Sequence, residues 1–190
     1  MKVIAFNGSA RKNGNTKQAI EMVFAELEKE GIETELIQLA DKKIQHCISC
    51  YRCVKEKDNK CHGQDDDVNE LIAKILDADG VILGSPTYFA NISSRMKAMV
   101  DRAGLVAKVN GDSFARKVGA AVVAVRRQGA CSIFSGLNYF FLINQMIVPG
   151  SSYWNLGIGL APGDIQNDEE GKQTFVNLGK NMAWLLKKLA

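Results

Sequence analysis

Short apolar segments with the length of buried strands alternate with amphipathic helical segments along the chain. The strand-like segments cover residues 3–6, 34–39, 80–84 and 117–125, and a fifth begins at residues 147–148. Strands that are apolar throughout are typical of parallel sheets covered by helices on both faces. With right-handed crossovers, five such strands fit a doubly wound α/β fold of strand order 2-1-3-4-5.

Length and composition are those of a single globular domain spanning residues 1–190. The content of 46% hydrophobic and 24% charged residues excludes collagen-like, disordered and coiled-coil chains. A net charge of +3, with the basic residues scattered, gives no reason to expect a nucleic-acid partner. The apolar start of the chain is too short for a signal peptide, and no apolar run approaches a membrane span. We therefore expect a cytoplasmic protein that binds neither nucleic acid nor membrane.

The strand order predicts where a ligand binds. In a sheet of this order the crevice lies between the first and third strands, beyond their carboxyl ends. The loops that follow these two strands, residues 7–15 and 85–93, are therefore expected to line one crevice.

The first of these loops joins a buried strand to the start of a helix and has the composition of a phosphate-binding loop. It is rich in Gly, Ser, Asn and Thr, and Arg11 and Lys12 add positive charge. Backbone N–H groups and the dipole at the start of a helix attract anions. The alternative is an ordinary strand–helix turn in which Asn15 caps the helix.

The common nucleotide-binding motifs are absent from this loop. No Gly-Lys-Ser/Thr occurs, which argues against a nucleoside triphosphate hydrolase. Gly8 and Gly14 are wrongly spaced for a dinucleotide fingerprint, and the second strand does not end in an acidic residue. Residues 157–162 begin like that fingerprint but lie late in the chain, so we expect no function for them.

The second loop presents groups that suit a planar ligand. Pro86 stiffens the turn, Thr87 and Asn91 offer hydrogen bonds, and Tyr88 and Phe89 supply aromatic surface. The alternative is that the two aromatic rings close the core. Because both loops meet at the predicted crevice, we favour an aromatic ligand that carries a phosphate.

Taken together, the motifs of the two loops and of the helix after them resemble those of a known family. The motifs are Gly8-Ser9-x-Arg11-x-x-Gly14-Asn15-Thr16, Gly84-Ser85-Pro86-Thr87-Tyr88 and Lys97-x-x-x-Asp101-Arg102. They resemble the NADPH-dependent FMN reductase family, and the likeness covers most of the chain. The resemblance implies a flavodoxin-like fold that binds FMN. It implies that the phosphate is surrounded by Ser9, Arg11, Asn15 and Thr16. It implies that the isoalloxazine ring is surrounded by Pro86, Thr87, Tyr88, Phe89 and Asn91.

The loop after the fourth strand, residues 126–129, is expected to reach the flavin ring as well. A cation near the pyrimidine edge stabilises the reduced anionic flavin and raises its potential. We assign this role to Arg127, and the alternative is a surface arginine pair that binds nothing.

Four cysteines stand close together in the pattern Cys47-x2-Cys50-x2-Cys53-x7-Cys61. In a chain without an export signal, such a group indicates metal, cluster or redox chemistry before disulfides. Three thiolates at this spacing can hold three corners of a cubane, and the fourth can fold back to the last iron. Three alternatives stay open: a zinc site that includes His46 or His62, a redox dithiol such as Cys50 and Cys53, and free thiols.

These cysteines lie in a segment, about residues 41–64, that interrupts the fold after the second strand. A compact cysteine motif at this point of a flavodoxin-like chain resembles the iron–sulfur flavoproteins. The resemblance implies a [4Fe–4S] cluster that passes electrons to FMN.

Four further features carry expectations that the tertiary structure can test. We expect Asp65-Asp66-Asp67 to be a solvated cap on the helix that follows it, and Cys131 to be a buried small hydrophobe. Residues 151–155 are expected to follow the fifth strand, with Trp154 covering a flavin or lying in the core or an interface. Residues 130–146 form a helix that is apolar nearly all round, so it is deeply buried or lies at a subunit interface. If the helix lies at a subunit interface, the protein is a homodimer or homotetramer.

These observations favour an FMN-dependent oxidoreductase that takes electrons from a nicotinamide nucleotide, NAD(P)H, and reduces a small-molecule acceptor. A second hypothesis is an electron carrier in which a cluster and FMN relay electrons between partners such as a ferredoxin-like protein. A third is a binding module held together by zinc.

Overall fold

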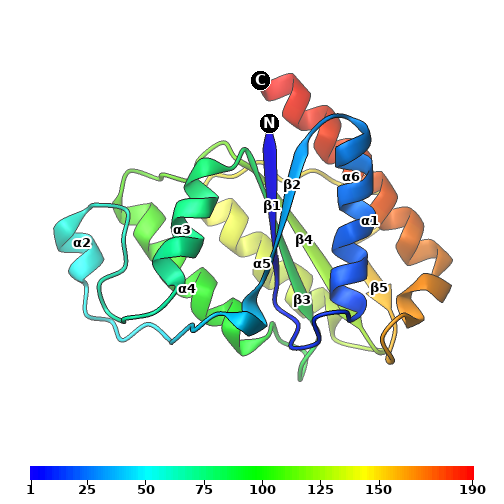
Figure 1. Ribbon diagram of the computed structural model, residues 1–190, viewed down its shortest axis with the longest axis horizontal. Coiled ribbons are helices and arrows are strands. Elements are labelled where there is room, and N and C mark those ends of the chain that lie inside the picture. Colours follow the sequence, from blue (N-terminus) through cyan, green and yellow to red (C-terminus); the bar gives the residue numbers. More distant parts are fainter.

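The computed structural model describes residues 1–190 and contains one five-stranded parallel sheet (Figure 1). Its strands are β1 (Lys2–Asn7), β2 (Glu33–Gln38), β3 (Gly80–Pro86), β4 (Val118–Val125) and β5 (Leu156–Ile158). Their order is β2-β1-β3-β4-β5, which confirms the doubly wound, flavodoxin-like arrangement.

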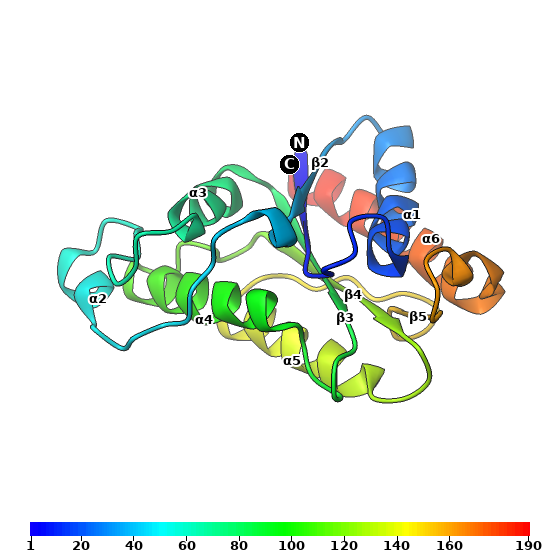
Figure 2. The same ribbon diagram turned by 60° about the horizontal axis from the view of Figure 1, so that its bottom comes forward.

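Helices cover both faces of the sheet (Figures 1 and 2). One face carries α1 (Asn15–Lys29) and α6 (Glu169–Leu189), and the other carries α3 (Val68–Asp77), α4 (Ser94–Val109) and α5 (Ala130–Ile143). A short helix, α2 (Arg52–Glu56), belongs to the cysteine segment and lies beside α4, and the 3-10 turns are η1 (Leu39–Asp41) and η2 (Asp164–Asn167). None of the helices is long and apolar enough to cross a membrane.

The sheet has an apolar core on each face because successive side chains of a strand point to opposite sides. In β1, Ile4 and Phe6 pack toward α3, α4 and α5, while Val3 and Ala5 pack toward α1 and α6. At the end of β3, a Cβ on Gly84 would lie only 2.6 Å from Ile20 Cδ1. The glycine therefore lets α1 approach the end of β3 and brings the start of that helix to the crevice.

The fifth strand does not lie where the sequence predicted it. Ile147 makes only an isolated parallel bridge to Val118, whereas β5 pairs with residues 123–125 of β4. Pro149 follows this bridge and has no N–H to continue a ladder, so the chain leaves the sheet and returns to it at Leu156. Residues 151–155, with Trp154, consequently precede the strand instead of following it.

One predicted helix cap is wrong, and another lies where it was predicted but makes different contacts. The N-cap of α1 is Gly14, and Asn15 is the first helical residue, with its side chain turned to another loop. Asp67 is the N-cap of α3, but its carboxylate accepts a hydrogen bond from Lys43 N instead of from the helix. Asp168 does cap its helix, because Oδ1 accepts from Gly171 N at 3.0 Å.

Helix α5 is not deeply buried. One side of it packs on the sheet, and the opposite side leaves Tyr139, Leu142 and Ile143 each more than half exposed. Cys131 lies on this exposed side, so the prediction of a buried cysteine is wrong. The sequence could not show this, because apolar residues occupy both sides of the helix.

Candidate functional site

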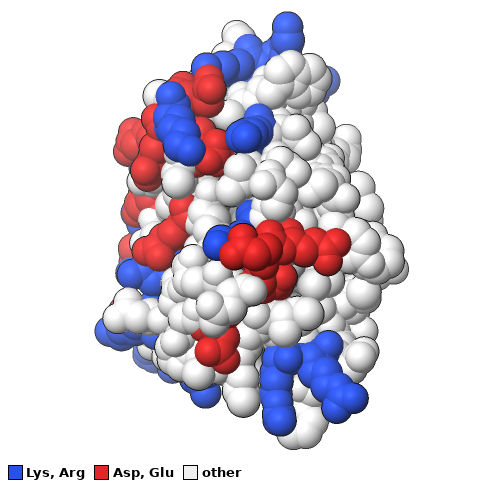
Figure 3. All heavy atoms as spheres, turned by 90° about the vertical axis from the view of Figure 1, so that its right-hand side faces the viewer, with Lys and Arg blue, Asp and Glu red and all other residues white.

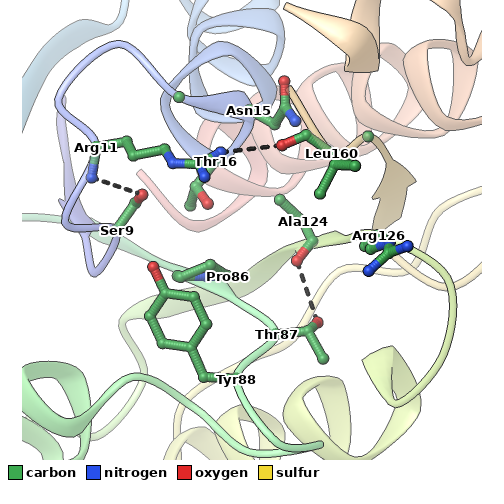
Figure 4. A pocket seen from close by; sticks show the side chains of 12 residues that line it. Ser9, Arg11, Asn15, Thr16, Pro86, Thr87, Tyr88, Ala124, Arg126 and Leu160 are labelled. Atoms are coloured by element: carbon green, nitrogen blue, oxygen red, sulfur yellow. Dashed lines mark hydrogen bonds between the residues drawn. The ribbon is translucent and has the colours of Figure 1, made fainter. Parts of the chain in front are cut away.

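A cavity of about 250 Å³ opens at the carboxyl edge of the sheet, between β1 and the strands beside it (Figure 4). Its lining residues come from the ends of β3 and β4, from the first turn of α1 and from the loops that follow β1, β3, β4 and β5. They are Ser9, Arg11, Gly14, Asn15, Thr16, Pro86, Thr87, Tyr88, Ala124, Arg126, Gly159 and Leu160. Both predicted loops therefore meet at one site, as the strand order required.

The loop after β1 is held in shape by its own polar groups. Asn7 Oδ1 accepts a hydrogen bond from Ser9 N at 3.1 Å, and Ser9 Oγ accepts one from Arg11 N at 3.1 Å. Ser9 and Thr16 are both buried, and the N–H groups of Thr16 and Lys17 have no acceptor within the chain. Free N–H groups at the start of a helix form a site for an anion.

The loop after β5 completes this side of the cavity. Arg11 Nη1 donates to Leu160 O at 2.9 Å, and Asn15 Nδ2 donates to Ala161 O at 3.0 Å. Asn15 Oδ1 accepts from Gly163 N at 2.9 Å, so its amide joins α1 to a loop far along the chain. The side chain of Asn15 is therefore occupied by these contacts and leaves the helix uncapped.

Gly159 and Leu160 line the cavity, although residues 157–162 were predicted to have no function. A signal for them existed, because Gly159 follows a short apolar segment. A Cβ on Gly159 would lie 2.6 Å from Asn15 Nδ2 and 2.9 Å from Ile165 N, so only glycine fits there. The fifth strand was predicted at residues 147–148. Its actual position, Leu156–Ile158, brings the segment that follows it to the crevice.

The end of β3 and the loop after it contribute Pro86, Thr87 and Tyr88 to the cavity, but not Phe89 or Asn91. Thr87 N and Oγ1 both donate to Ala124 O, at 2.9 and 3.1 Å, which fixes this loop to β4 (Figure 4). Phe89 lies fully exposed at the tip of a tight turn with φ of 50°. Asn91 Oδ1 accepts from Ile92 N, and the side chain borders a separate groove between α4 and α5.

The loop after β4 brings Arg126 to the cavity, whereas the exposed Arg127 does not line it. The cavity thus holds two arginines, Arg11 and Arg126, and no carboxylate among its lining residues. On the face shown in Figure 3, basic side chains project at the lower end, which is the carboxyl edge of the sheet, below a band of acidic residues. The charge around the cavity favours an anionic ligand.

The cysteine segment lies against α3 and α4, with its thiols at different depths. Cys53 and Cys61 are buried, Cys47 is half-buried and Cys50 is exposed. Burial raises the pKa of the Cys53 thiol above its usual value, and the neighbouring Cys61 thiol adds to this effect. The backbone of Cys61 is fixed to α3 by two hydrogen bonds with the side chain of Asn69, at 2.8 and 3.0 Å.

The backbone of this segment is tightly curled. Ser49, Tyr51, Lys57 and Asn59 all have φ between 48° and 60°. This left-handed conformation costs an L-residue about 1–2 kcal/mol, so it persists at these four residues because the contacts around them hold it.

No three His, Cys, Asp or Glu side chains surround a common point at which a single metal ion could bind. His62 Nε2 pairs with Asp58 Oδ1 at 3.0 Å. Among the cysteine sulfurs, Cys61 Sγ accepts a hydrogen bond from Arg102 Nε at 3.2 Å.

Asp66 is not part of a solvated cap, contrary to the sequence-based prediction. Its side chain is 1% exposed and pairs with Arg102, whose side chain is 0% exposed, at 2.5 Å. Burial alone would raise the pKa of Asp66, but the hydrogen bonds from Arg102 and from Gln45 N hold it below its usual value. The acidic triplet gave no sign of this pair, because the arginine comes from α4.

The strand order and the basic, carboxylate-free cavity at the switch point define a flavodoxin-like protein. Solved structures agree on the fold. A flavodoxin from the domain Archaea aligns with a TM-score of 0.64 at 19% identity, covering 98% of this chain and 99% of that chain. RosB with a bound 8-demethyl-8-formylriboflavin-5'-phosphate intermediate aligns with a TM-score of 0.77 at 22% identity, covering 100% and 80%.

Within this class, the NADPH-dependent FMN reductase family model matches residues 1–161, and the chain belongs to that family. Similar proteins are named iron–sulfur flavoproteins. One from Methanocaldococcus jannaschii is 42% identical over 194 aligned positions, and the alignment covers 98% of each chain. One from Methanosarcina thermophila is 29% identical over 189 residues, covering 98% of this chain and 96% of that one.

Proposed function

We propose that this chain is an FMN-dependent oxidoreductase that binds its flavin at the cavity on the carboxyl edge of the sheet. The observation that carries the proposal is the anion-binding end of this cavity. There, buried hydroxyls, unpaired N–H groups at the start of α1 and Arg11 meet with no carboxylate among the lining residues. This set of groups fits a phosphate monoester.

In this proposal each wall of the cavity has its own task. Ser9, Thr16 and the first turn of α1 bind the phosphate, while Pro86 and Tyr88 border the ring. Bound flavin supplies the chemistry by accepting a hydride from a nicotinamide nucleotide and passing electrons to an acceptor. Phe89 and Asn91 do not line the cavity, so contacts between them and the ring require a movement of the turn that carries them.

The phosphate assignment can be tested with two neighbouring basic residues. Arg11 lines the cavity, whereas the exposed Lys12 pairs with Asp41 at 2.6 Å and does not line it. A hydrogen bond to a charged group contributes about 1.5–3 kcal/mol, so Arg11→Gln should weaken FMN binding roughly ten- to a hundredfold or more. Lys12→Gln is the matched control. Equal affinities for both variants in a fluorescence titration would contradict the assignment.

We propose further that Cys47, Cys50, Cys53 and Cys61 hold a [4Fe–4S] cluster. The names of the similar proteins support this, as do the curled backbone and the two buried thiols. In a cubane each thiolate binds a different iron, so the four sulfurs need not meet at one point, whereas zinc needs them to. Anaerobic purification with assays of flavin, iron, zinc and sulfide tests this: about four irons and four sulfides per chain are expected. Zinc without sulfide would refute it.

The electron-carrier hypothesis remains the second candidate, favoured by the cysteine segment. Steady turnover with NADPH and a quinone supports the enzyme, and reduction only by reduced ferredoxin supports the carrier. A cytoplasmic location stays a prediction from the sequence.

A further inference from the structure

Arg102 has the largest fully buried side chain in the molecule, and the hydrogen bonds of its guanidinium are incomplete. Nη1 donates to Asp66 Oδ2 at 2.5 Å and to Gln45 O at 3.1 Å, and Nε donates to Cys61 Sγ at 3.2 Å. Nη2 is buried and has no acceptor in the chain. Buried N–H groups are nearly always paired, so an acceptor from outside the chain is expected here.

The geometry of arginine shows which way the free donor points. The guanidinium is planar, and its Nε–H and one Nη2–H leave from the same edge of the plane. Since Nε on that edge donates to Cys61 Sγ, the adjacent Nη2–H is directed to the same side, toward the cysteine segment. The opposite end of the guanidinium is held by Asp66, so the side chain cannot turn away without breaking a buried ion pair.

We propose that Arg102 is a positioning residue for the group held by the cysteine segment. Its Nε–H holds the sulfur of Cys61, and its Nη2–H donates to a sulfide of the cluster. The proposal rests on the [4Fe–4S] assignment above. None of the four cysteines lies on α4, and an arginine does not bind iron. Arg102 therefore acts on the cluster only through hydrogen bonds and charge.

A physical consequence distinguishes this role from a purely structural one. Hydrogen bonds to the sulfurs of a cluster set its reduction potential. A buried cation beside the cluster stabilises the reduced state, which carries one more negative charge. Arg102 therefore raises the potential of the cluster, whereas an ion pair that merely fastens the segment to α4 would leave it unchanged.

The test uses the full chain, purified and reconstituted without oxygen. The variant is Arg102→Gln combined with Asp66→Asn, because Arg102→Gln alone would leave a buried carboxylate without a partner. Arg102→Lys keeps the charge with a single donor group. Arg52→Gln is the control, since Arg52 lies in the cysteine segment but donates to His62 O and to no sulfur. Bound FMN and circular dichroism report the fold, and iron, sulfide and an EPR-monitored titration report the cluster.

We expect the double variant to keep FMN and four irons, with the reduction equilibrium shifted at least tenfold toward the oxidised cluster. A tenfold shift is a fall of 59 mV for a one-electron couple. Arg102→Lys should shift it less, and Arg52→Gln should match the wild type. A folded double variant with a full cluster and an unchanged potential would overturn the proposal.

A second measurement decides the case even if the double variant fails to fold. In wild-type protein grown with ¹⁵N-guanidinium arginine, pulsed EPR of the reduced cluster should detect a coupled nitrogen that Arg52→Gln keeps and Arg102→Lys loses. Absence of this coupling in the wild type overturns the role of Arg102. Failure of the wild type to take up iron and sulfide would instead refute the cluster assignment itself, and the metal analysis separates the two results.

Discussion

The side chain of Asn15 accepts a hydrogen bond from the N–H of Gly163, 148 residues further along the chain, at 2.9 Å. This contact joins the first turn of α1 to the loop after β5 and closes one wall of the cavity. The wall that binds the phosphate in our proposal is therefore made from both ends of the sequence.

Substitution of Gly159 should damage this wall. A Cβ at this position would lie 2.6 Å from Asn15 Nδ2, so Gly159→Ala must displace the amide or the loop. We expect weaker FMN binding and a loss of about 1–3 kcal/mol in the free energy of unfolding, because buried polar groups lose partners. Gly150→Ala is the control, since nothing lies within 4 Å of a Cβ there. Equal FMN affinity of the two variants in a titration would be evidence against a shared wall.

The flavin potential should depend on Arg126 more than on Arg127. The sequence favoured Arg127 as the cation near the ring, but Arg126 lines the cavity and Arg127 does not. Removing a cation near the ring disfavours the reduced anionic flavin, so Arg126→Gln should lower its midpoint potential by roughly 30 mV, a tenfold change for two electrons. Arg127→Gln serves as the control in a spectroelectrochemical titration. A larger shift from Arg127→Gln would restore the original assignment.

Acid should weaken the fold through the buried pair of Asp66 and Arg102. The pKa of Asp66 in the folded chain is held below its ordinary value of 3.8. The unfolded state therefore takes up this proton first, and the stabilisation is fully present above 3.8 and is lost as the pH falls through the folded pKa.

Urea unfolding at several pH values measures this effect. We expect the Arg102→Gln, Asp66→Asn double variant to lose less stability between neutral pH and pH of about 3 than the wild type does. Asp66→Ala alone, at neutral pH, should cost about 3–5 kcal/mol because it leaves a buried charge unpaired. Parallel pH profiles for wild type and double variant would show that this pair does not govern acid stability.

The exposed side of α5 predicts self-association. Tyr139, Leu142 and Ile143 are 69%, 60% and 63% exposed on one helix face, beside the groove that α5 forms with α4. Burying such apolar surface drives the association of subunits. We expect a homodimer or homotetramer that Leu142→Glu with Ile143→Lys converts to smaller species in light scattering. Leu189→Glu, an exposed leucine at the far end of α6, should leave the mass unchanged, and a monomeric wild type would refute the prediction.

The sequence determined the first four strands, the main helices and the sheet order. Apolar runs such as residues 118–125 and helical stripes such as that of α6 are local patterns, and each decides which face of an element is buried. Right-handed crossovers then leave few arrangements, which is why the two loops at the crevice could be predicted to meet.

Tertiary structure alone decided which residues complete each site. A short strand such as β5 carries too few residues for a local pattern, so its position follows from pairing with β4. The contacts of Asn15 with the loop after β5, and of Arg102 with Asp66 and Cys61, join residues distant in sequence. Such contacts depend on how helices pack over the sheet. A periodic pattern records only which side of a helix or strand is apolar, and not which polar partner another element brings to it.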